Sequence, residues 1–127
     1  MANTTQRKKA KLRKECDNLW YQAVIERWGT RCEVCGKSAS LGHHFFTKSS
    51  YGHLRYDIDN GISLCMGCHF TLHNKQDTMI TLKIIKKRGQ NWLNSLEARA
   101  KIRPEGSYQT LKYYEETKIN LLTLIKQ

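Results

Sequence analysis

Two Cys-x-x-Cys pairs in the middle of the chain are its clearest sign of metal chemistry. Cys32 and Cys35 form the first pair, and Cys65 and Cys68 form the second. Each short spacing turns two sulfur atoms toward one ion, so two pairs can close a tetrahedral site of four thiolates. A thioredoxin-like redox motif is the rival interpretation, but it needs only one pair. We therefore predict a structural Zn²⁺ site, because four thiolates leave no open position on the ion.

A helical spacing relates two of the five histidines. His69 and His73 are four residues apart in CHFTLH, so on a helix they share one face and can bind one ion. On that helix Cys68 points about 120° away from the pair, which separates a histidine site from the cysteine site. Chance placement on the surface is the alternative for an isolated pair. Beside the four cysteines we interpret it as half of a second metal site.

A further ligand is expected from LGHHFF, in which His43 and His44 are adjacent. Neighbouring residues of a strand point to opposite faces, so both side chains should not bind the same ion. We expect one of them on the second metal and the other beside it, free to accept a proton. The pKa of a free histidine lies near neutrality, which suits it to that task.

The charge of the chain is strongly positive. Its 127 residues include 22 Lys and Arg against 11 Asp and Glu, and six of the basic side chains lie in residues 7–14. Such an excess favours a polyanionic partner, most often nucleic acid and less often an anionic membrane surface. A basic protein without such a partner is the alternative.

The sequence shows no sign of a membrane span or a secretory signal. No apolar run approaches the roughly 18 residues that a span needs, and the first residues lack the apolar segment of a signal peptide. We therefore expect no membrane partner and a cytoplasmic location. Cysteines in that compartment bind metals more often than they form disulfides.

The elements that must position these residues are predicted from the apolar spacing. Residues 1–14 are polar and without periodicity, and we expect a flexible basic arm, followed by one domain over residues 15–127. A helix is expected over residues 15–28, with Gly29 in the turn that ends it and with Cys16 on its apolar side and therefore in the core. Residues 30–64 contain short pieces typical of a cysteine knuckle and two brief strands.

Helices are expected to dominate the rest of the chain. Asp77 is expected to cap one helix, a further helix ends before Pro104, and Ser107 is expected to cap the last. These helices form a C-terminal extension, residues 78–126, to a central unit of residues 32–75.

That central unit resembles the HNH nucleases, also called ββα-metal or His-Me finger nucleases. Their pattern is a Cys-x-x-Cys knuckle, a strand ending in Asp-His or His-His, a loop with an Asn, and LCxxCH at the start of a helix. Here CEVC, GHHFF, YDIDNGIS and LCMGCHFTLH follow in that order over residues 32–73. The resemblance implies an α+β fold, with a small treble-clef ββα-metal core around the structural four-cysteine zinc and with N- and C-terminal helices wrapped around it.

The resemblance also implies roles by position. His44 takes the place of the general base, and Asn60 that of the residue which holds the loop of the base in orientation. His43, His69 and His73 take the places of the metal ligands. Because His43 stands where Asp is usual, the ligand set is all nitrogen, which favours Zn²⁺, Ni²⁺ or Mn²⁺ over Mg²⁺ as the one catalytic divalent ion.

Together these features predict a metal-dependent DNA endonuclease that hydrolyses phosphodiester bonds. Lys48 and Arg55 flank the proposed site and are expected to contact backbone phosphates. Asp57 and Asp59 are expected in a turn or in hydrogen bonds instead of on the metal, and His53 in a loop. GHHF and LRYDIDNGISLCMGCH are also similar to the phage NinG (Rap-like) recombination nucleases, which implies nicked or branched recombination intermediates as substrates.

The rival function from another class is a non-catalytic zinc-containing module that binds nucleic acid. Such a module would keep its binding in a His44→Ala variant and have no cleavage to lose. A zinc protease is disfavoured, because HFTLH lacks the glutamate of HExxH. The pattern carries no prediction of oligomeric state.

Overall fold

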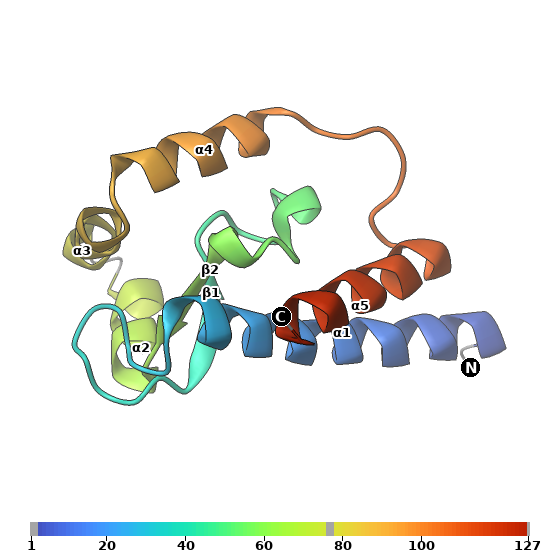
Figure 1. The fold of residues 1–127 in the computed structure, drawn as a ribbon, viewed down its shortest axis with the longest axis horizontal. Coiled ribbons are helices and arrows are strands. Elements are labelled where there is room, and N and C mark those ends of the chain that lie inside the picture. The colour runs from blue at the N-terminus through green and yellow to red at the C-terminus, as the bar shows by residue number, and fades with distance from the viewer. Residues whose placement is uncertain (1–2, 76–77, 127) are drawn as a thin grey trace.

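A two-stranded antiparallel sheet lies between five helices in the computed structural model, which describes residues 3–75 and 78–126 (Figure 1). The strands are β1 (Leu41–His44) and β2 (Gly61–Leu64), and the helices are α1 (Thr4–Trp28), α2 (Met66–Asn74), α3 (Thr78–Arg88), α4 (Gln90–Lys101) and α5 (Leu111–Lys126). Two single-turn 3-10 helices, Gly52–Leu54 and Ile58–Asn60, lie between the strands. The expected α+β fold class is confirmed, with β1, β2 and α2 as a ββα unit beside four clustered cysteines. No helix in the described ranges is long and apolar enough to cross a membrane.

Strand β2 is buried between α1 and α3, whereas β1 is partly exposed. Leu41 pairs with Leu64 and His44 with Gly61, which fixes the register of the two strands. Ile62 and Leu64 of β2 are fully buried in a core cluster that includes residues of α3. On the α1 side a Cβ on Gly61 would collide with Val24. Glycine at this position therefore lets α1 cross close to the strands.

Helix α1 begins at Thr4, eleven residues before the expected start at residue 15, so residues 4–14 belong to the helix. Asn3 and Gln6 form a capping box, in which the Asn3 side chain accepts from the Gln6 N–H at 2.8 Å. The residues after them, largely Lys, Arg, Ala and Leu, favour helix. The apolar periodicity missed this part because its side chains are mostly charged.

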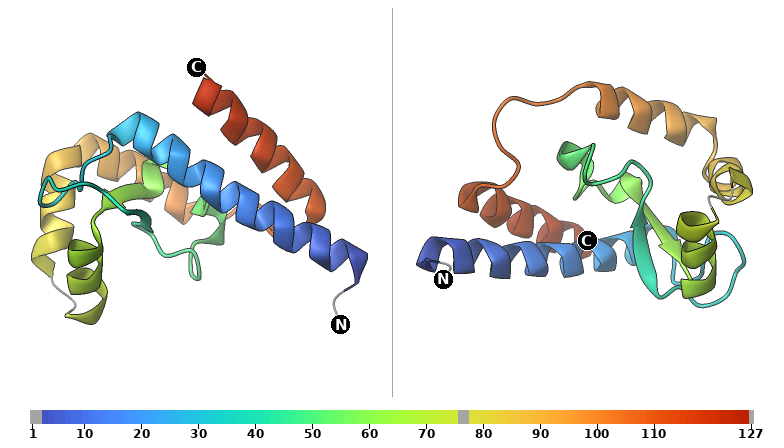
Figure 2. Two further views of the ribbon diagram at one scale, coloured as in Figure 1. Left: turned by 90° about the horizontal axis from the view of Figure 1, so that it is seen from below. Right: turned by 180° about the vertical axis from the view of Figure 1, so that it is seen from behind.

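Helices α1 and α5 run side by side in the same direction (Figures 1 and 2), and α5 begins beside Lys8, Lys11 and Leu12 of α1. Cys16 is fully buried between them and its thiol donates to the Tyr114 carbonyl at 3.4 Å, which confirms it as a core residue. Glu15 and Lys118 form an ion pair at 2.6 Å across the same interface.

The caps of the later helices differ in part from expectation. Thr110, and not Ser107, caps α5, since its hydroxyl oxygen accepts from the Tyr113 N–H at 3.1 Å. The Ser107 hydroxyl accepts from Gln109 in the turn before the helix. The expected cap Asp77 lies outside the described residues.

Arg88, at the end of α3, joins four parts of the core. Its guanidinium forms a bidentate ion pair with Glu33 of the cysteine knuckle, and both side chains are 1% exposed. It also donates to the carbonyls of Asp59 and Gly61 and stacks on Trp28 at 3.5 Å. The charge is thus fully paired inside the protein.

Replacing Arg88 by methionine should lower the free energy of unfolding by about 3–5 kcal/mol, because Glu33 would remain buried without its partner. Urea denaturation of the zinc-loaded protein measures the change. The double variant Glu33→Gln, Arg88→Met leaves no buried charge and should recover part of the loss. A single variant as stable as the parent would contradict the role of Arg88.

Candidate active site and metal centres

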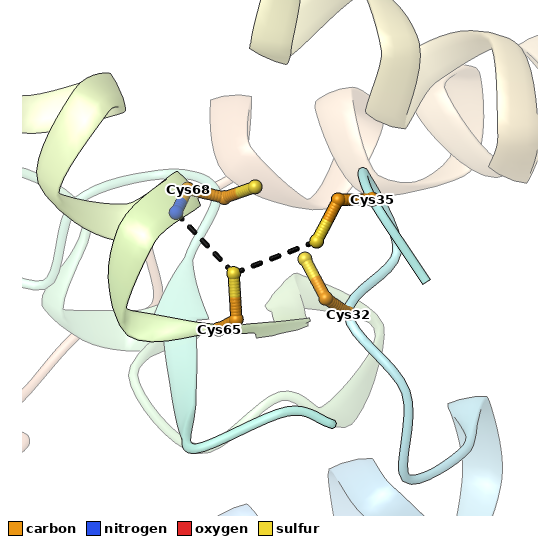
Figure 3. A group of neighbouring side chains, drawn as sticks. All are labelled: Cys32, Cys35, Cys65 and Cys68. Atoms are coloured by element: carbon orange, nitrogen blue, oxygen red, sulfur yellow. Dashed lines mark hydrogen bonds between the residues drawn. The ribbon is translucent and has the colours of Figure 1, made fainter. Parts of the chain in front are cut away.

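The four cysteines meet between the knuckle and α2. Their sulfur atoms point toward one another (Figure 3) and all lie within 4.8 Å of each other. Cys35 Sγ and Cys65 Sγ are 3.6 Å apart, close to the roughly 3.8 Å sulfur–sulfur edge of a tetrahedron with 2.3 Å Zn–S bonds. Cys65 is also the N-cap of α2, where its sulfur accepts from the Cys68 N–H at 3.4 Å. The cluster therefore fits a structural Zn²⁺.

The thiol pKa values show why this cluster needs a cation. Burial raises the pKa of Cys32, but backbone N–H groups, led by that of Cys35, outweigh it and lower the pKa to about 6. Burial and the neighbouring cysteine sulfurs raise the pKa of Cys68 well above its usual value. One thiol ionises readily and another resists, so four thiolates together require a bound positive charge.

Three histidines form a second cluster, with their ring nitrogens within 4.8 Å of one another. His43 comes from β1, while His69 and His73 come from α2, and the His43 ring centre lies 5.1 Å from that of His73. Three imidazole nitrogens around one point can hold a divalent ion and leave positions open for substrate. Helix α2 thus contributes to both clusters, on different faces.

Burial keeps two of these imidazoles, those of His43 and His69, neutral. Burial, helped by His73 and His69, lowers the pKa of His43 to about 3, and burial also lowers the pKa of His69. A neutral imidazole is the form that binds a metal, so His43 and His69 need not lose a proton to bind one at neutral pH.

His44 sits beside this cluster with its ring held on two sides. The ring stacks on the indole of Trp20, 4.1 Å between centres and 5° between planes. Its Nε2 lies 3.0 Å from the Arg55 carbonyl oxygen. Because a carbonyl only accepts hydrogen bonds, Nε2 carries the proton and Nδ1 keeps a free lone pair. Burial, together with Lys48 and Arg55, lowers the His44 pKa to about 4, so the ring is neutral at pH 7.

An open cavity of about 450 Å³ joins these parts. Both adjacent histidines of β1 and both histidines of α2 line it, with Lys48 on the loop after β1 and with Asp17 and Trp20 on α1. The structure therefore brings the predicted base, the predicted ligands and one predicted phosphate contact into one space.

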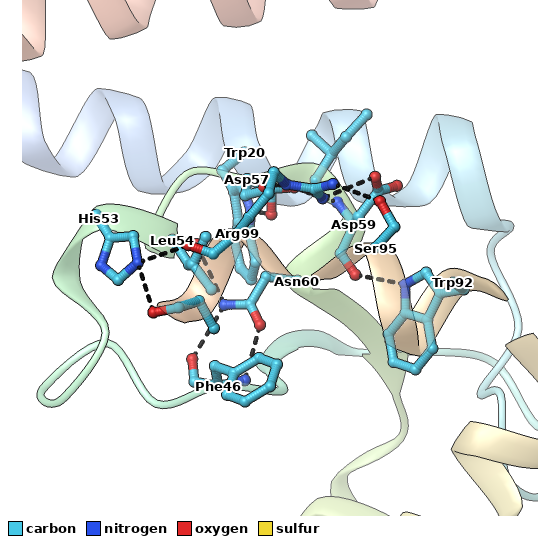
Figure 4. Close-up of polar contacts among 12 residues, drawn as sticks. Trp20, Phe46, His53, Leu54, Asp57, Asp59, Asn60, Trp92, Ser95 and Arg99 are labelled. Carbon is cyan, nitrogen blue, oxygen red and sulfur yellow. Dashed lines mark hydrogen bonds and ion pairs between the residues drawn. The ribbon is translucent and has the colours of Figure 1, made fainter. Parts of the chain in front are cut away.

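Asn60 fastens the loop that follows His44 (Figure 4). Its side chain is fully buried, accepts from the Phe46 N–H at 2.7 Å and donates to the carbonyls of Phe46 and Leu54. These bonds tie the start of the loop to residues just before Arg55, whose carbonyl meets His44. Asn60 thus lies behind the cavity and braces it.

The Arg55 guanidinium, which was expected to contact phosphate, forms an ion pair inside the protein. Its guanidinium donates to both carboxylate oxygens of Asp17, the shortest of these bonds being 3.0 Å. A phosphate contact by Arg55 would have to compete with this ion pair. Lys48 is exposed and lines the cavity, and no ion pair among the described residues competes with its predicted phosphate contact.

Asp57, Asp59 and His53 do not line the cavity, and Figure 4 shows Asp57 and Asp59 beside Arg99. Asp57 caps the second 3-10 helix, and both carboxylates pair with Arg99, which confirms their hydrogen-bonding role. His53 belongs to the first 3-10 helix, and its Nε2 meets the carbonyls of Arg99 and Ala100 at the end of α4.

The sequence patterns missed Asp17 and Trp20 as parts of the site. Trp20 was expected only as an apolar residue of its helix, but its ring supports His44 and its indole N–H donates to the Asp57 carbonyl at 2.9 Å. No local signal marks these residues, because they come from α1 and join the site only through the fold.

The family model for HNH endonucleases matches residues 32–75. No curated protein and no solved structure matches the chain. The matched segment begins at the first cysteine of the knuckle and ends one residue after α2, so it contains both metal clusters and His44. Helices α1, α3, α4 and α5 lie outside it.

Proposed function

We propose that this protein is a metal-dependent DNA endonuclease in which His44 is the general base and His43, His69 and His73 hold one divalent ion. The observation that carries the proposal is a neutral histidine of fixed tautomer in the same cavity as a three-nitrogen ligand set. The HNH match over residues 32–75 supports a nuclease or nucleic-acid function.

Each residue of the proposed site has its own task in phosphodiester hydrolysis. His44 Nδ1 takes the proton of the attacking water, while the Arg55 carbonyl accepts from Nε2–H and stabilises the imidazolium that forms. Lys48 is placed to bind the substrate phosphate, and Asn60 keeps the loop in position. A divalent ion at the three histidines would stabilise negative charge on the phosphoryl and leaving oxygens. The all-nitrogen set favours Zn²⁺, Ni²⁺ or Mn²⁺ over Mg²⁺.

Cleavage of supercoiled plasmid by the purified protein tests this proposal. We expect nicks or breaks with one or more of Zn²⁺, Ni²⁺, Mn²⁺ and Mg²⁺, and none with a chelator. Nicked and branched duplexes belong in the same panel, because the narrower resemblance to NinG-like nucleases favours them as substrates. His44→Ala protein purified in parallel controls for contaminating nucleases. Binding without cleavage under every metal would overturn the proposal and favour a non-catalytic zinc module.

A further inference from the structure

The first half of α1 carries a dense positive charge that neither metal cluster uses. Six side chains between residues 7 and 14 are basic, none is acidic, and five of the six are exposed. They are Arg7, Lys8, Lys9, Lys11, Arg13 and Lys14. None of the six enters an ion pair in the described part of the chain.

Helix stability does not explain this placement. The N-terminal end of a helix carries the positive pole of its dipole, so cations there are unfavourable, and the first turn of α1 has no acidic residue. Leu111, the first residue of α5, lines a groove with Lys8 and Lys11, so the N-terminal end of α5 brings a second positive pole to this segment. Cations that destabilise the helix carrying them are typical of a functional surface.

One side of this charged segment continues from the catalytic cavity. Asp17 lines the cavity, and Arg13 and Lys14 stand four and three residues before it, on the same side of the helix. Arg7 lies on that side too, two turns before Lys14 and closer to the N-terminal end of α1. At 1.5 Å per residue, the helix between Thr4 and Asp17 extends about 20 Å beyond the cavity, the length of about six base pairs at 3.4 Å each.

The chemistry of the surface fits a sugar–phosphate backbone and not a membrane. A helix that lies on a lipid surface needs large apolar side chains beside its cations. The large hydrophobic residues exposed in the described chain lie on α2, α3, α5 and just after α4, and none lies on α1. Solvated lysine and arginine alone suit phosphate contacts.

We propose that the first three turns of α1 bind the backbone of duplex DNA on one side of the scissile phosphate. This rests on the proposed nuclease function. Arg13 and Lys14 contact the phosphates nearest the cavity, and Arg7 contacts one farther along the duplex. These contacts set the affinity and the register of the duplex without reading its sequence.

Two double variants of equal charge test the contact. Arg13→Gln with Lys14→Gln removes two cations on the cavity side, whereas Lys8→Gln with Lys11→Gln removes two that line a groove against α5. Glutamine keeps the helix, because its helix propensity matches that of lysine and arginine. Fluorescence anisotropy with a labelled duplex over a salt series should show a slope of log Kd against log salt lowered by about 2 in the first variant.

The control variant should lose clearly less slope, and Arg13→Lys with Lys14→Arg should bind like the parent. Equal losses in both glutamine variants would overturn the proposal, since they would show diffuse charge instead of a contact surface. These measurements need no catalysis, so a protein that binds in this way but never cuts would refute the proposed function and leave the α1 contact standing.

Trimming the duplex tests the one-sided geometry. Parent affinity and cleavage should fall when the flank on one side of the mapped cut becomes shorter than about six base pairs, and should tolerate the same trimming on the other side. The Arg13→Gln, Lys14→Gln variant should lose this asymmetry. Equal sensitivity on both sides of the cut would contradict the assignment of α1 to one flank.

Discussion

Replacing His44 by alanine should lower the rate of DNA cleavage by roughly 10²–10⁴-fold, the typical worth of a general base. Both metal clusters should stay loaded, because the His44 nitrogens face the Arg55 carbonyl and the cavity and are not among the clustered ligand atoms. Single-turnover kinetics on plasmid DNA measure the rate, and metal analysis of the same sample measures the content. His44→Gln fills more of the space beside Trp20 and separates loss of the base from loss of packing.

The matched variant His73→Ala should fail for a different reason. Its side chain is one of the three clustered nitrogen ligands, so its loss should weaken affinity for the second ion, and excess metal should restore part of the activity. The four-cysteine zinc should remain. Calorimetry that showed His44→Ala losing the second ion, and His73→Ala keeping it, would mean that the two roles are reversed.

The metal clusters were predictable from sequence because their ligands are set by short-range geometry. A Cys-x-x-Cys spacing brings two sulfurs together within a turn, and the four-residue spacing of His69 and His73 places both on one side of a helix. Pairing of β1 with β2 is enough to bring the first Cys-x-x-Cys pair to the second and His43 to the histidines of α2. The turn-rich segment between the strands allows that pairing. The described structure places all seven ligands as two groups.

The contacts that α1 makes at the cavity were not predictable in the same way. Trp20 reaches His44 only because glycines in both strands let α1 pass close to the sheet, a contact between segments far apart in the sequence. The early start of α1 depends on a capping box that precedes a charged run without apolar periodicity. The Arg88–Glu33 pair likewise joins distant segments, and nothing local marks either residue.

Helix α2 physically links the four-cysteine cluster and the proposed three-histidine metal site. It has nine residues, none of them buried, and isolated helices of this length are unstable in water. Its N-cap is the sulfur of Cys65, and Cys68 in its first turn faces the other cysteines. The thiolate site therefore holds the start of the helix, and the same helix carries His69 four residues and His73 eight residues after Cys65.

Replacing Cys68 by serine should therefore weaken both metal sites. Losing one of four ligands removes about a quarter of the zinc binding free energy, on the order of 3 kcal/mol or ~100-fold in affinity. The second ion should also bind more weakly, because α2 no longer holds its histidines against His43. Metal analysis after dialysis measures both contents, and Co²⁺ in place of Zn²⁺ reports thiolate ligation by its absorption.

The control for this dependence is His69→Ala, which removes a ligand from the second site alone. This variant should lose the second ion and keep the four-cysteine zinc, since Cys65 and Cys68 hold α2 without any histidine. A Cys68→Ser protein that binds the second ion with the affinity of the parent would show that the two sites are independent. If Cys68→Ser weakens both sites and His69→Ala weakens only the second, the zinc cluster organises the site that contains the histidines. Loss of the zinc would then abolish cleavage although His44 is unchanged.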